Sequence, residues 1–222
     1  MSIRTKVVLL IVGWLVLDQV VKILVKTQMF YGETIPVFGQ WFRLHFVENE
    51  GMAFGVSFGG VAGKIGLSLF RLAAVAGLSV FIHKMIKKGM PTGFILALGM
   101  ITAGAAGNII DSAFYGLIFN ESGPSNPMIP GSGIAELFPK EGGYAPFLQG
   151  RVVDMLYFPV IKFNWPDWVP MVGGNRFEFF RPIFNLADTA ITVGVGWILL
   201  FQRKALKALD QPTQTSEEQA QS

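Results

Sequence analysis

Long apolar stretches separated by short polar ones dominate the first half of the chain and return near its end. The four stretches cover residues 7–25, 65–82, 93–119 and 183–201. Each has about the length of the roughly 20 residues that a transmembrane helix needs. The pattern therefore predicts a membrane protein with four transmembrane helices.

Basic residues flank these stretches unevenly. They lie before the first stretch, between the second and the third, and after the fourth, as Arg4, Lys6, Lys84, Lys87, Lys88, Arg203, Lys204 and Lys207. With four spans these places fall on one side of the membrane, and the positive-inside rule makes that side cytoplasmic. We therefore expect both termini inside the cell, with 30–63 and 120–182 outside the cytoplasm.

The two outside segments differ in their patterns. Residues 41–47 are rich in aromatic and branched side chains, which favours a strand, and 33–39 is a candidate partner strand. Residues 120–150 are rich in Gly, Pro and Ser, which is typical of a loop. Strand-like and aromatic sequence returns at 151–169. The fold predicted is a membrane all-α protein with a small extracytoplasmic β element and inserted loops.

Composition agrees with a lipid environment. Apolar residues make up 51% of the 222 residues and charged residues 15%, whereas soluble domains carry about a quarter charged residues. The chain has no cysteine, which excludes disulfides, thiol catalysis and Cys-ligated metals. Its net charge of +3 reflects the basic flanks of the apolar stretches, so no nucleic-acid partner is expected. We expect one integral domain over 1–210 and a polar cytoplasmic tail over 211–222.

Small residues recur at helical spacing in two of the apolar stretches. Gly99, Ala103 and Gly107 are four residues apart, as are Ala190 and Gly194. Such stripes let helix backbones approach closely in lipid. They predict tight packing between the third and fourth helices and their neighbours.

Polar and charged residues also lie within or beside the apolar stretches, as Asp18, Lys22, Arg71, Asn108, Asp111, Asn185 and Asp188. A charge at the bilayer centre costs about 2.5–3.5 kcal/mol on insertion scales, so such residues usually have a function. Asp18 and Lys22 are four residues apart on one helix and are expected to form a structural ion pair. Two interpretations of Arg71 stay open: it extends to the membrane surface, or it binds a phosphate or carboxylate.

The remaining acids suggest a chemical role. Asn108 and Asp111 share a helix face, as do Asn185 and Asp188, and Asp154 adds a carboxylate in the outside segment. Two facing carboxylates can hydrolyse a peptide bond, because the ionised one takes a proton from water while the protonated one polarises the carbonyl. Periodicity leaves open which two would pair. It also leaves open a structural role in a scaffold, or an ion path in a transporter, although the lack of an internal repeat counts against a transporter.

Five short motifs resemble those of the lipoprotein signal peptidase (signal peptidase II) family. In chain order they occupy 18–22, 49–55, 104–111, 152–154 and 184–191. Each motif is modest alone, but five in the family's order on a four-helix plan are specific. The resemblance implies a bacterial inner-membrane aspartic endopeptidase, which removes the signal peptide of prolipoproteins by cutting before a diacylglyceryl-modified cysteine.

The resemblance also implies a role for each matched residue. Asp154 and Asp188 would be the catalytic pair, and Asp18 and Lys22 would be structural. The supporting or substrate-binding residues would be Asn49, Gly51, Asn108, Asp111, Asn185 and Arg151. The strands would cradle the substrate near the outer face of the membrane. No metal or cofactor is implied, the partners are the lipid-modified prolipoprotein and membrane lipid, and the chain is expected to be a monomer.

Two features depart from the family pattern. Ser112 stands where the family usually has Arg, and Arg151 and Arg181 are candidates to supply the missing cation. The stretches 120–150 and 160–182 are longer than in typical members. We interpret these inserts as decoration, with a lid over the site as the alternative.

Overall fold

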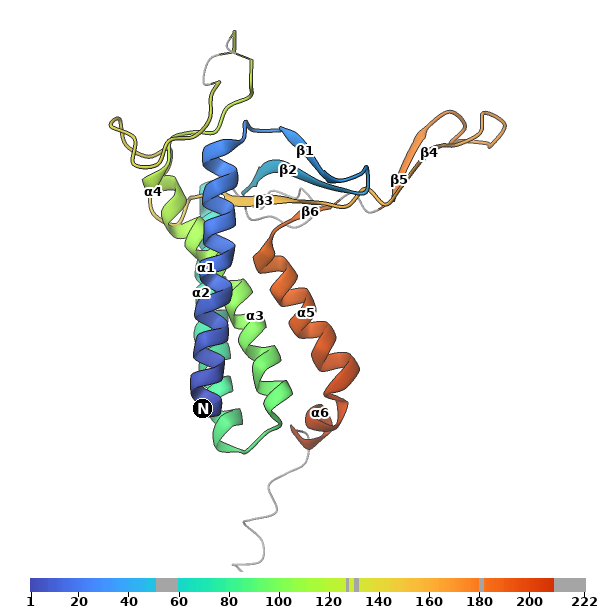
Figure 1. Cartoon of the computed structure of the whole chain (residues 1–222). Coiled ribbons are helices and arrows are strands. Elements are labelled where there is room, and N and C mark those ends of the chain that lie inside the picture. The colour runs from blue at the N-terminus through green and yellow to red at the C-terminus, as the bar shows by residue number, and fades with distance from the viewer. Residues whose placement is uncertain (51–59, 127, 130–131, 180–181, 210–222) are drawn as a thin grey trace, which may run out of the picture.

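The computed structural model describes residues 1–50, 60–126, 128–129, 132–179 and 182–209. An elongated helical bundle forms most of the molecule, and a small sheet lies across one end of it (Figure 1). The helices are α1 (Ile3–Gln28), α2 (Gly60–Lys87), α3 (Thr92–Ile110), the π-helical turn η1 (Asp111–Tyr115), α4 (Gly116–Ile118), α5 (Leu186–Phe201) and α6 (Arg203–Leu209). The N-terminus and α6 both lie at the end of the bundle opposite the sheet.

Three helical runs in the described part of the chain are long and apolar enough to cross a membrane. They are α1, α2 and the run from α3 through α4, over Thr92–Ile118. The apolar helix α5 has 16 residues and is about 24 Å long, compared with the roughly 30 Å of a bilayer's hydrocarbon core. The fourth transmembrane span therefore stays a prediction.

The helix α5 begins three residues later than the predicted start at 183. Ile183–Phe184 forms a short strand, β6, and Asn185 caps the helix that follows. The Asn185 side chain accepts the Asp188 N–H, while the Asp188 carboxylate accepts the Asn185 N–H. This capping box fixes where α5 starts and holds Asp188 in its first turn.

The sheet across the bundle end is antiparallel, in the order β1-β2-β3-β6. Its other strands are β1 (Thr34–Phe38), β2 (Phe42–Asn49) and β3 (Val152–Tyr157), so the strands predicted at 33–39 and 41–47 are present and pair with each other. A separate ribbon, β4 (Ile161–Asn164) with β5 (Arg176–Phe179), projects away from the bundle (Figure 1). The 160–182 insert is therefore largely a β-ribbon.

One face of the sheet packs on a buried apolar cluster at the end of the bundle. Phe46, Val153 and Met155 belong to this cluster, together with Val25 and Met29 of α1. Successive side chains of a strand point to opposite faces, so the residue between Val153 and Met155 points away from the cluster. That residue is Asp154, which is how the packing of β3 directs its carboxylate to the other face of the sheet.

Small residues bring α3 close to its neighbours, as the stripes predict. A Cβ on Gly104 would lie 2.2 Å from the Ala187 carbonyl oxygen, and one on Gly107 would lie 2.6 Å from Asp18 Oδ2. A Cβ on Gly194 would lie 2.8 Å from the Ala97 carbonyl oxygen. Gly104 and Gly194 therefore let the backbones of α3 and α5 meet with almost no side chain between them, and Gly107 leaves room beside α3 for the Asp18 carboxylate of α1.

The end of the 120–150 insert is fixed to the helix before it. Backbone N–H groups of Tyr144, Ala145, Leu148 and Gly150 donate to the carbonyls of Phe119, Gly116, Ala113 and Ser112, respectively. Of these four acceptors, Gly116 lies in the last turn of the helical run, where carbonyls have no partner within the helix. This end of the insert then leads directly into β3. The interpretation of the rest of the insert as decoration or lid stays a prediction.

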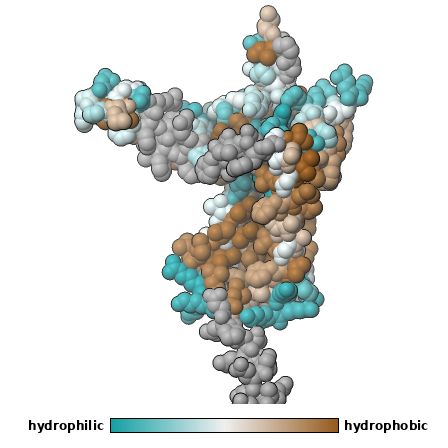
Figure 2. Space-filling model, turned by 180° about the vertical axis from the view of Figure 1, so that it is seen from behind, coloured by the Kyte–Doolittle hydropathy of each residue, from teal (hydrophilic) through white to brown (hydrophobic). Residues whose placement is uncertain are grey.

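Surface polarity follows the length of the bundle. Apolar side chains cover the helices in a broad belt, and hydrophilic residues form a rim at the end away from the sheet (Figure 2). Basic residues at helix ends there include Lys84 and Lys87 of α2 and Lys207 of α6. A belt of this kind agrees with a multi-pass membrane protein.

Candidate active site

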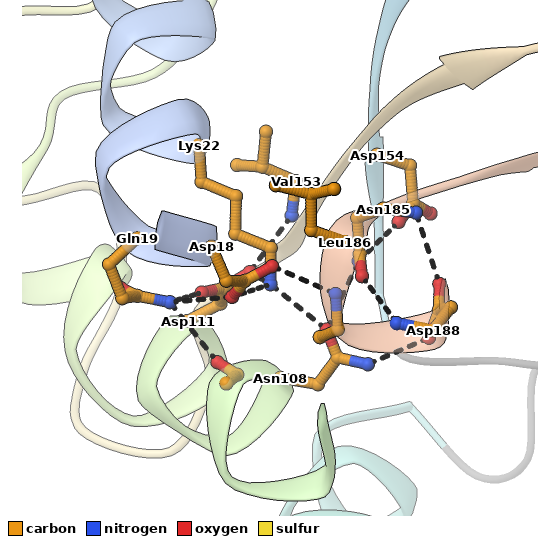
Figure 3. A network of polar contacts seen from close by, with 12 residues as sticks. Asp18, Gln19, Lys22, Asn108, Asp111, Val153, Asp154, Asn185, Leu186 and Asp188 are labelled. Carbon is orange, nitrogen blue, oxygen red and sulfur yellow. Dashed lines mark hydrogen bonds and ion pairs between the residues drawn. The ribbon is translucent and has the colours of Figure 1, made fainter. Parts of the chain in front are cut away.

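Two aspartates meet where the sheet reaches the start of α5 (Figure 3). Asp154 lies within β3, and Asp188 lies in the first turn of α5. Asp154 is only 4% exposed, and Asp188 is half-buried. The charge of Asp188 acts on the Asp154 carboxyl, so the two groups are close enough to interact. We call this pair the dyad.

Two asparagines hold the dyad from the helix side. Asn185 Nδ2 donates to Asp154 Oδ1 at 2.7 Å, and Asn108 Nδ2 donates to Asp188 Oδ1 at 2.9 Å. The Asn108 side-chain oxygen accepts from Asn185 Nδ2 at 3.1 Å and from Lys22 Nζ at 3.0 Å. Because those two donors occupy its oxygen, the Asn108 amide nitrogen is oriented toward Asp188.

The strand β2 adds a third asparagine. Asn49 Nδ2 donates to Asp154 Oδ2 over a longer distance of 3.4 Å. The Val47 backbone lies opposite Asp154 in the sheet, so Asn49 reaches the carboxylate diagonally across the two strands. Gly51, which the resemblance places next to this contact, lies outside the described residues.

A second group of buried charges lies beside the dyad (Figure 3). Lys22 Nζ makes ion pairs of 3.0 Å with Asp18 Oδ2 and 2.8 Å with Asp111 Oδ2, and all three side chains are at most 1% exposed. Gln19 Nε2 donates to both carboxylates, at 3.1 and 2.9 Å. The predicted pair of Asp18 and Lys22 is therefore present, and Asp111 joins it from η1. We call these residues the Lys22 cluster.

The Lys22 cluster also holds the backbone on both sides of the site. Asp18 Oδ1 accepts the N–H of Ala187 at 2.9 Å, and Asp111 Oδ2 accepts the N–H of Val153 at 3.2 Å. Each of these N–H groups belongs to the residue immediately before a member of the dyad. The cluster therefore ties β3 and the start of α5 to the same lysine.

Asp154, the member of the dyad that lies in the sheet, has a pKa shifted by its surroundings. Burial, and after it the negative charge of Asp188, raises the pKa of Asp154 to about 7. Hydrogen bonds from Asn185 and Asn49 and the charge of Lys22 oppose this shift. With such a pKa, about half of the Asp154 carboxyl groups carry a proton in neutral solution, so Asp154 can act as an acid.

The first departure from the family pattern, Ser112, can be described at the site together with Arg151, one of the two candidates for the missing cation. Ser112 is buried, and its hydroxyl donates to the Asn108 carbonyl oxygen at 3.0 Å. Arg151 makes ion pairs with Glu48 at 3.3 Å and Glu121 at 2.9 Å, and its guanidinium lies over the Tyr144 ring. Its charge is therefore engaged away from the dyad. Arg181 lies outside the described residues.

Sequence reasoning missed one member of the site and left another without a role. Gln19 links the carboxylates of the Lys22 cluster to the Gly107 carbonyl and accepts from the Tyr115 hydroxyl at 3.1 Å. The sequence signal that could have identified Gln19 is its polar amide inside the first apolar stretch. Arg71 on α2 interacts electrostatically with the dyad. Among the described residues, no group of three His, Cys, Asp or Glu side chains could hold a metal ion.

Comparison with known proteins assigns the family. A model of the signal peptidase (SPase) II family matches residues 10–203. The chain belongs to this family. A lipoprotein signal peptidase of Porphyromonas gingivalis is 45% identical over 201 residues, which cover 90% of this chain and 84% of the relative. One of Amoebophilus asiaticus is 35% identical over 205 residues, covering 91% of this chain and 78% of the relative.

Solved structures resemble the fold of this chain. Two bacterial membrane enzymes, solved in meso at 2.3 and 1.9 Å resolution, superpose with a TM-score of 0.55 each. They are 20% and 22% identical to this chain and cover 94% of it, with 94% and 95% of their own chains included. At this identity the likeness shows a shared overall fold.

Proposed function

We propose that this member of the signal peptidase II family is an aspartic endopeptidase that cleaves lipid-modified prolipoproteins. The observation that carries the proposal is the half-buried dyad, in which asparagine side chains donate to both carboxylates. The cut would release the signal peptide and leave a free amine on the diacylglyceryl-modified cysteine. No metal or cofactor takes part in the proposed reaction.

The dyad supplies the two groups that peptide hydrolysis needs. Ionised Asp188 takes a proton from a water molecule, and the resulting hydroxide adds to the scissile carbonyl carbon. Protonated Asp154 donates to the carbonyl oxygen, so the negative charge that develops there is neutralised. The tetrahedral intermediate then collapses as its C–N bond breaks, and the leaving amine takes up the proton that Asp188 received from water. One hydroxyl group of the intermediate returns a proton to Asp154 as the new carboxyl group forms, which restores the starting protonation of the dyad.

The proposed topology puts this chemistry where the substrate is. Basic helix ends lie at the end of the bundle opposite the sheet, and the positive-inside rule makes that end cytoplasmic. The dyad lies at the sheet end, so it would stand near the outer face of the inner membrane. A lipid-anchored peptide has its scissile bond at this depth, and water is available there for hydrolysis.

Cleavage by the purified full-length protein tests the proposal. We expect wild-type protein in detergent to cut a diacylglyceryl-modified prolipoprotein at the bond before the modified cysteine, with the product identified by mass spectrometry. The same prolipoprotein without the lipid is the matched control and should be cut at least about tenfold more slowly, because the lipid contributes binding energy at the membrane surface. A well-folded protein that leaves the lipidated substrate intact would contradict the proposal.

The proposed roles predict how the rate depends on pH. Asp154 must carry a proton, and its pKa of about 7 lies well above that of an ordinary carboxyl group. The cleavage rate should therefore fall as pH rises through about 7, approaching tenfold per pH unit on the alkaline side. A kcat/KM profile measured from about pH 5 to about pH 9 checks this. A rate that stayed level across the alkaline half of that range would contradict the role given to Asp154.

A further inference from the structure

Within the described part of the chain, no hydrogen bond to the dyad comes from a positively charged side chain. Four aspartates converge at this end of the bundle, as Asp18, Asp111, Asp154 and Asp188. Lys22 ion-pairs with the first two, and Asp154 is neutral while it holds its proton. Asp188 must be ionised to act as a base, and the hydrogen bonds that it receives from described residues come from the neutral Asn108 amide and the Asn185 backbone. An ionised carboxylate in a half-buried site is stabilised by a nearby cation.

Helix geometry places Arg71 at the depth of the dyad. The helices α2 and α3 are consecutive and antiparallel, and a short turn joins Lys87 to Thr92. Arg71 precedes Lys87 by 16 residues, and Asn108 follows Thr92 by 16 residues. At 1.5 Å per residue both lie about 24 Å from the turn. Arg71 is therefore level with Asn108, which donates directly to Asp188.

The inward face of α2 includes Arg71. Lys64, Ser68 and Arg71 follow at helical spacing on one side of α2. Lys64 Nζ pairs with Glu50 at 3.0 Å, and Ser68 Oγ donates to the Leu148 carbonyl at 3.2 Å. These two contacts turn this side of α2 toward the sheet and the end of the 120–150 insert.

The residues next to Arg71 face the other way. Phe70 is 70% exposed and Leu72 is 51% exposed, whereas Arg71 itself is half-buried. Phe70 and Leu72 thus form the outward-facing surface of α2 at this level, and Arg71 does not. Among the charges that act on it, Asp188 comes first, followed by Asp111 and Asp154. Of the two interpretations that the sequence left open for Arg71, the carboxylate-facing one fits this placement.

We propose that Arg71 is the counter-ion that keeps Asp188 ionised, so that Asp154 is the member of the dyad that carries the proton. The proposal rests on the proposed aspartic mechanism and deepens it by assigning a positioning role to a residue of α2. The side chain acts on the dyad through its charge. Arg71 would also replace the positive charge that the family usually has at position 112. In this chain that position is Ser112, whose hydroxyl donates to the Asn108 carbonyl of its own helix.

The proposal makes the acidic side of the pH profile depend on Arg71. Among the described residues, the charged groups near Asp188 are Arg71 on α2, Asp154 on β3, Asp111 on η1, and Lys22 and Asp18 on α1. Removing the cation of α2 leaves the others in place and makes the ionised form of Asp188 less favourable. The cleavage rate would then fall at a higher pH as the solution is acidified.

The experiment compares kcat/KM profiles of purified wild type, Arg71→Gln and Arg71→Lys on the lipid-modified prolipoprotein. The acidic limb of a profile is the part where kcat/KM falls as the pH is lowered. In Arg71→Gln we expect this limb to lie at a pH higher by about one unit than in wild type, which is the lower end of the effect of one opposite charge close to a carboxylate. In Arg71→Lys the limb should return most of the way to its wild-type position. Lys84→Gln, which removes an exposed cation from the other end of α2, is the matched control and should leave the limb unchanged.

The outcomes separate this proposal from the proposed function. An acidic limb in Arg71→Gln at the wild-type pH overturns the role of Arg71, and so does an equal shift in Arg71→Gln and Arg71→Lys. Either result leaves the dyad in place if the wild type still cuts. A merely structural arginine would lower the yield or the melting temperature of folded protein without moving the limb, so thermal unfolding of each variant is measured alongside. If wild type does not cut at all, the proposed function fails first.

Discussion

Asp188→Asn is expected to abolish cleavage while leaving the fold intact. The amide cannot take a proton from water, and general-base catalysis contributes about 10²–10⁴-fold to rates, so we expect a fall in kcat of at least about a hundredfold. The fold should survive because the side-chain oxygen of the introduced amide can still accept the Asn185 N–H at the start of α5. Single-turnover cleavage of the lipid-modified substrate measures the effect, with thermal unfolding in detergent as the test of folding.

A matched control separates chemistry from the loss of a negative charge. Asp167→Asn makes the same substitution at an exposed aspartate in the loop between β4 and β5. This variant should cut like wild type. If Asp188→Asn retained more than about a tenth of the wild-type kcat in the same assay, the assignment of Asp188 as the base would be wrong.

Lys22→Met is expected to be the most destabilising single change at the site. The substitution leaves the carboxylates of Asp18 and Asp111 buried without the ammonium that bonds both. Removing one partner of a buried ion pair costs about 3–5 kcal/mol. We therefore expect little folded protein in membranes and a melting temperature lowered by several degrees in what can be purified.

The same substitution near the other end of α1 provides the comparison. Lys6 is exposed, so Lys6→Met removes one positive charge without leaving a buried carboxylate unpaired. Its melting temperature should stay within about one degree of wild type, since surface substitutions change stability by about 0.5 kcal/mol or less. Equal unfolding temperatures for the two variants would show that the Lys22 cluster contributes little to stability.

The sequence predicted those parts of the structure that depend on spacing along one element. Asp18 and Lys22 are four residues apart on one helix, which is enough to expect their ion pair. The apolar stretches predicted the long helices, and the aromatic and branched residues at 41–47 predicted the strand there. Asn108 and Asn185 could be named from motifs, although their bonds to opposite members of the dyad could not.

Contacts to backbone groups carry no sequence signal, and these were missed. The N–H groups of Ala187 and Val153 bind Asp18 and Asp111 whatever their side chains are. The late start of α5 was missed for a related reason, because Ile183–Phe184 continues the apolar pattern of the helix but pairs with β3. The depth of Arg71 and the direction that it faces could be inferred only from the lengths of two helices and the exposure of the neighbouring residues.

The two backbone contacts of the Lys22 cluster have a consequence for motion. Because β3 and the start of α5 are each tied to a carboxylate bound by the same ammonium, they are restrained relative to α1 as one unit. The spacing of the dyad is thereby insulated from displacements elsewhere in the molecule. A lipid-bearing peptide that needs space to enter would obtain it from α2 or from the β1 edge of the sheet, and the reacting groups would keep their separation throughout.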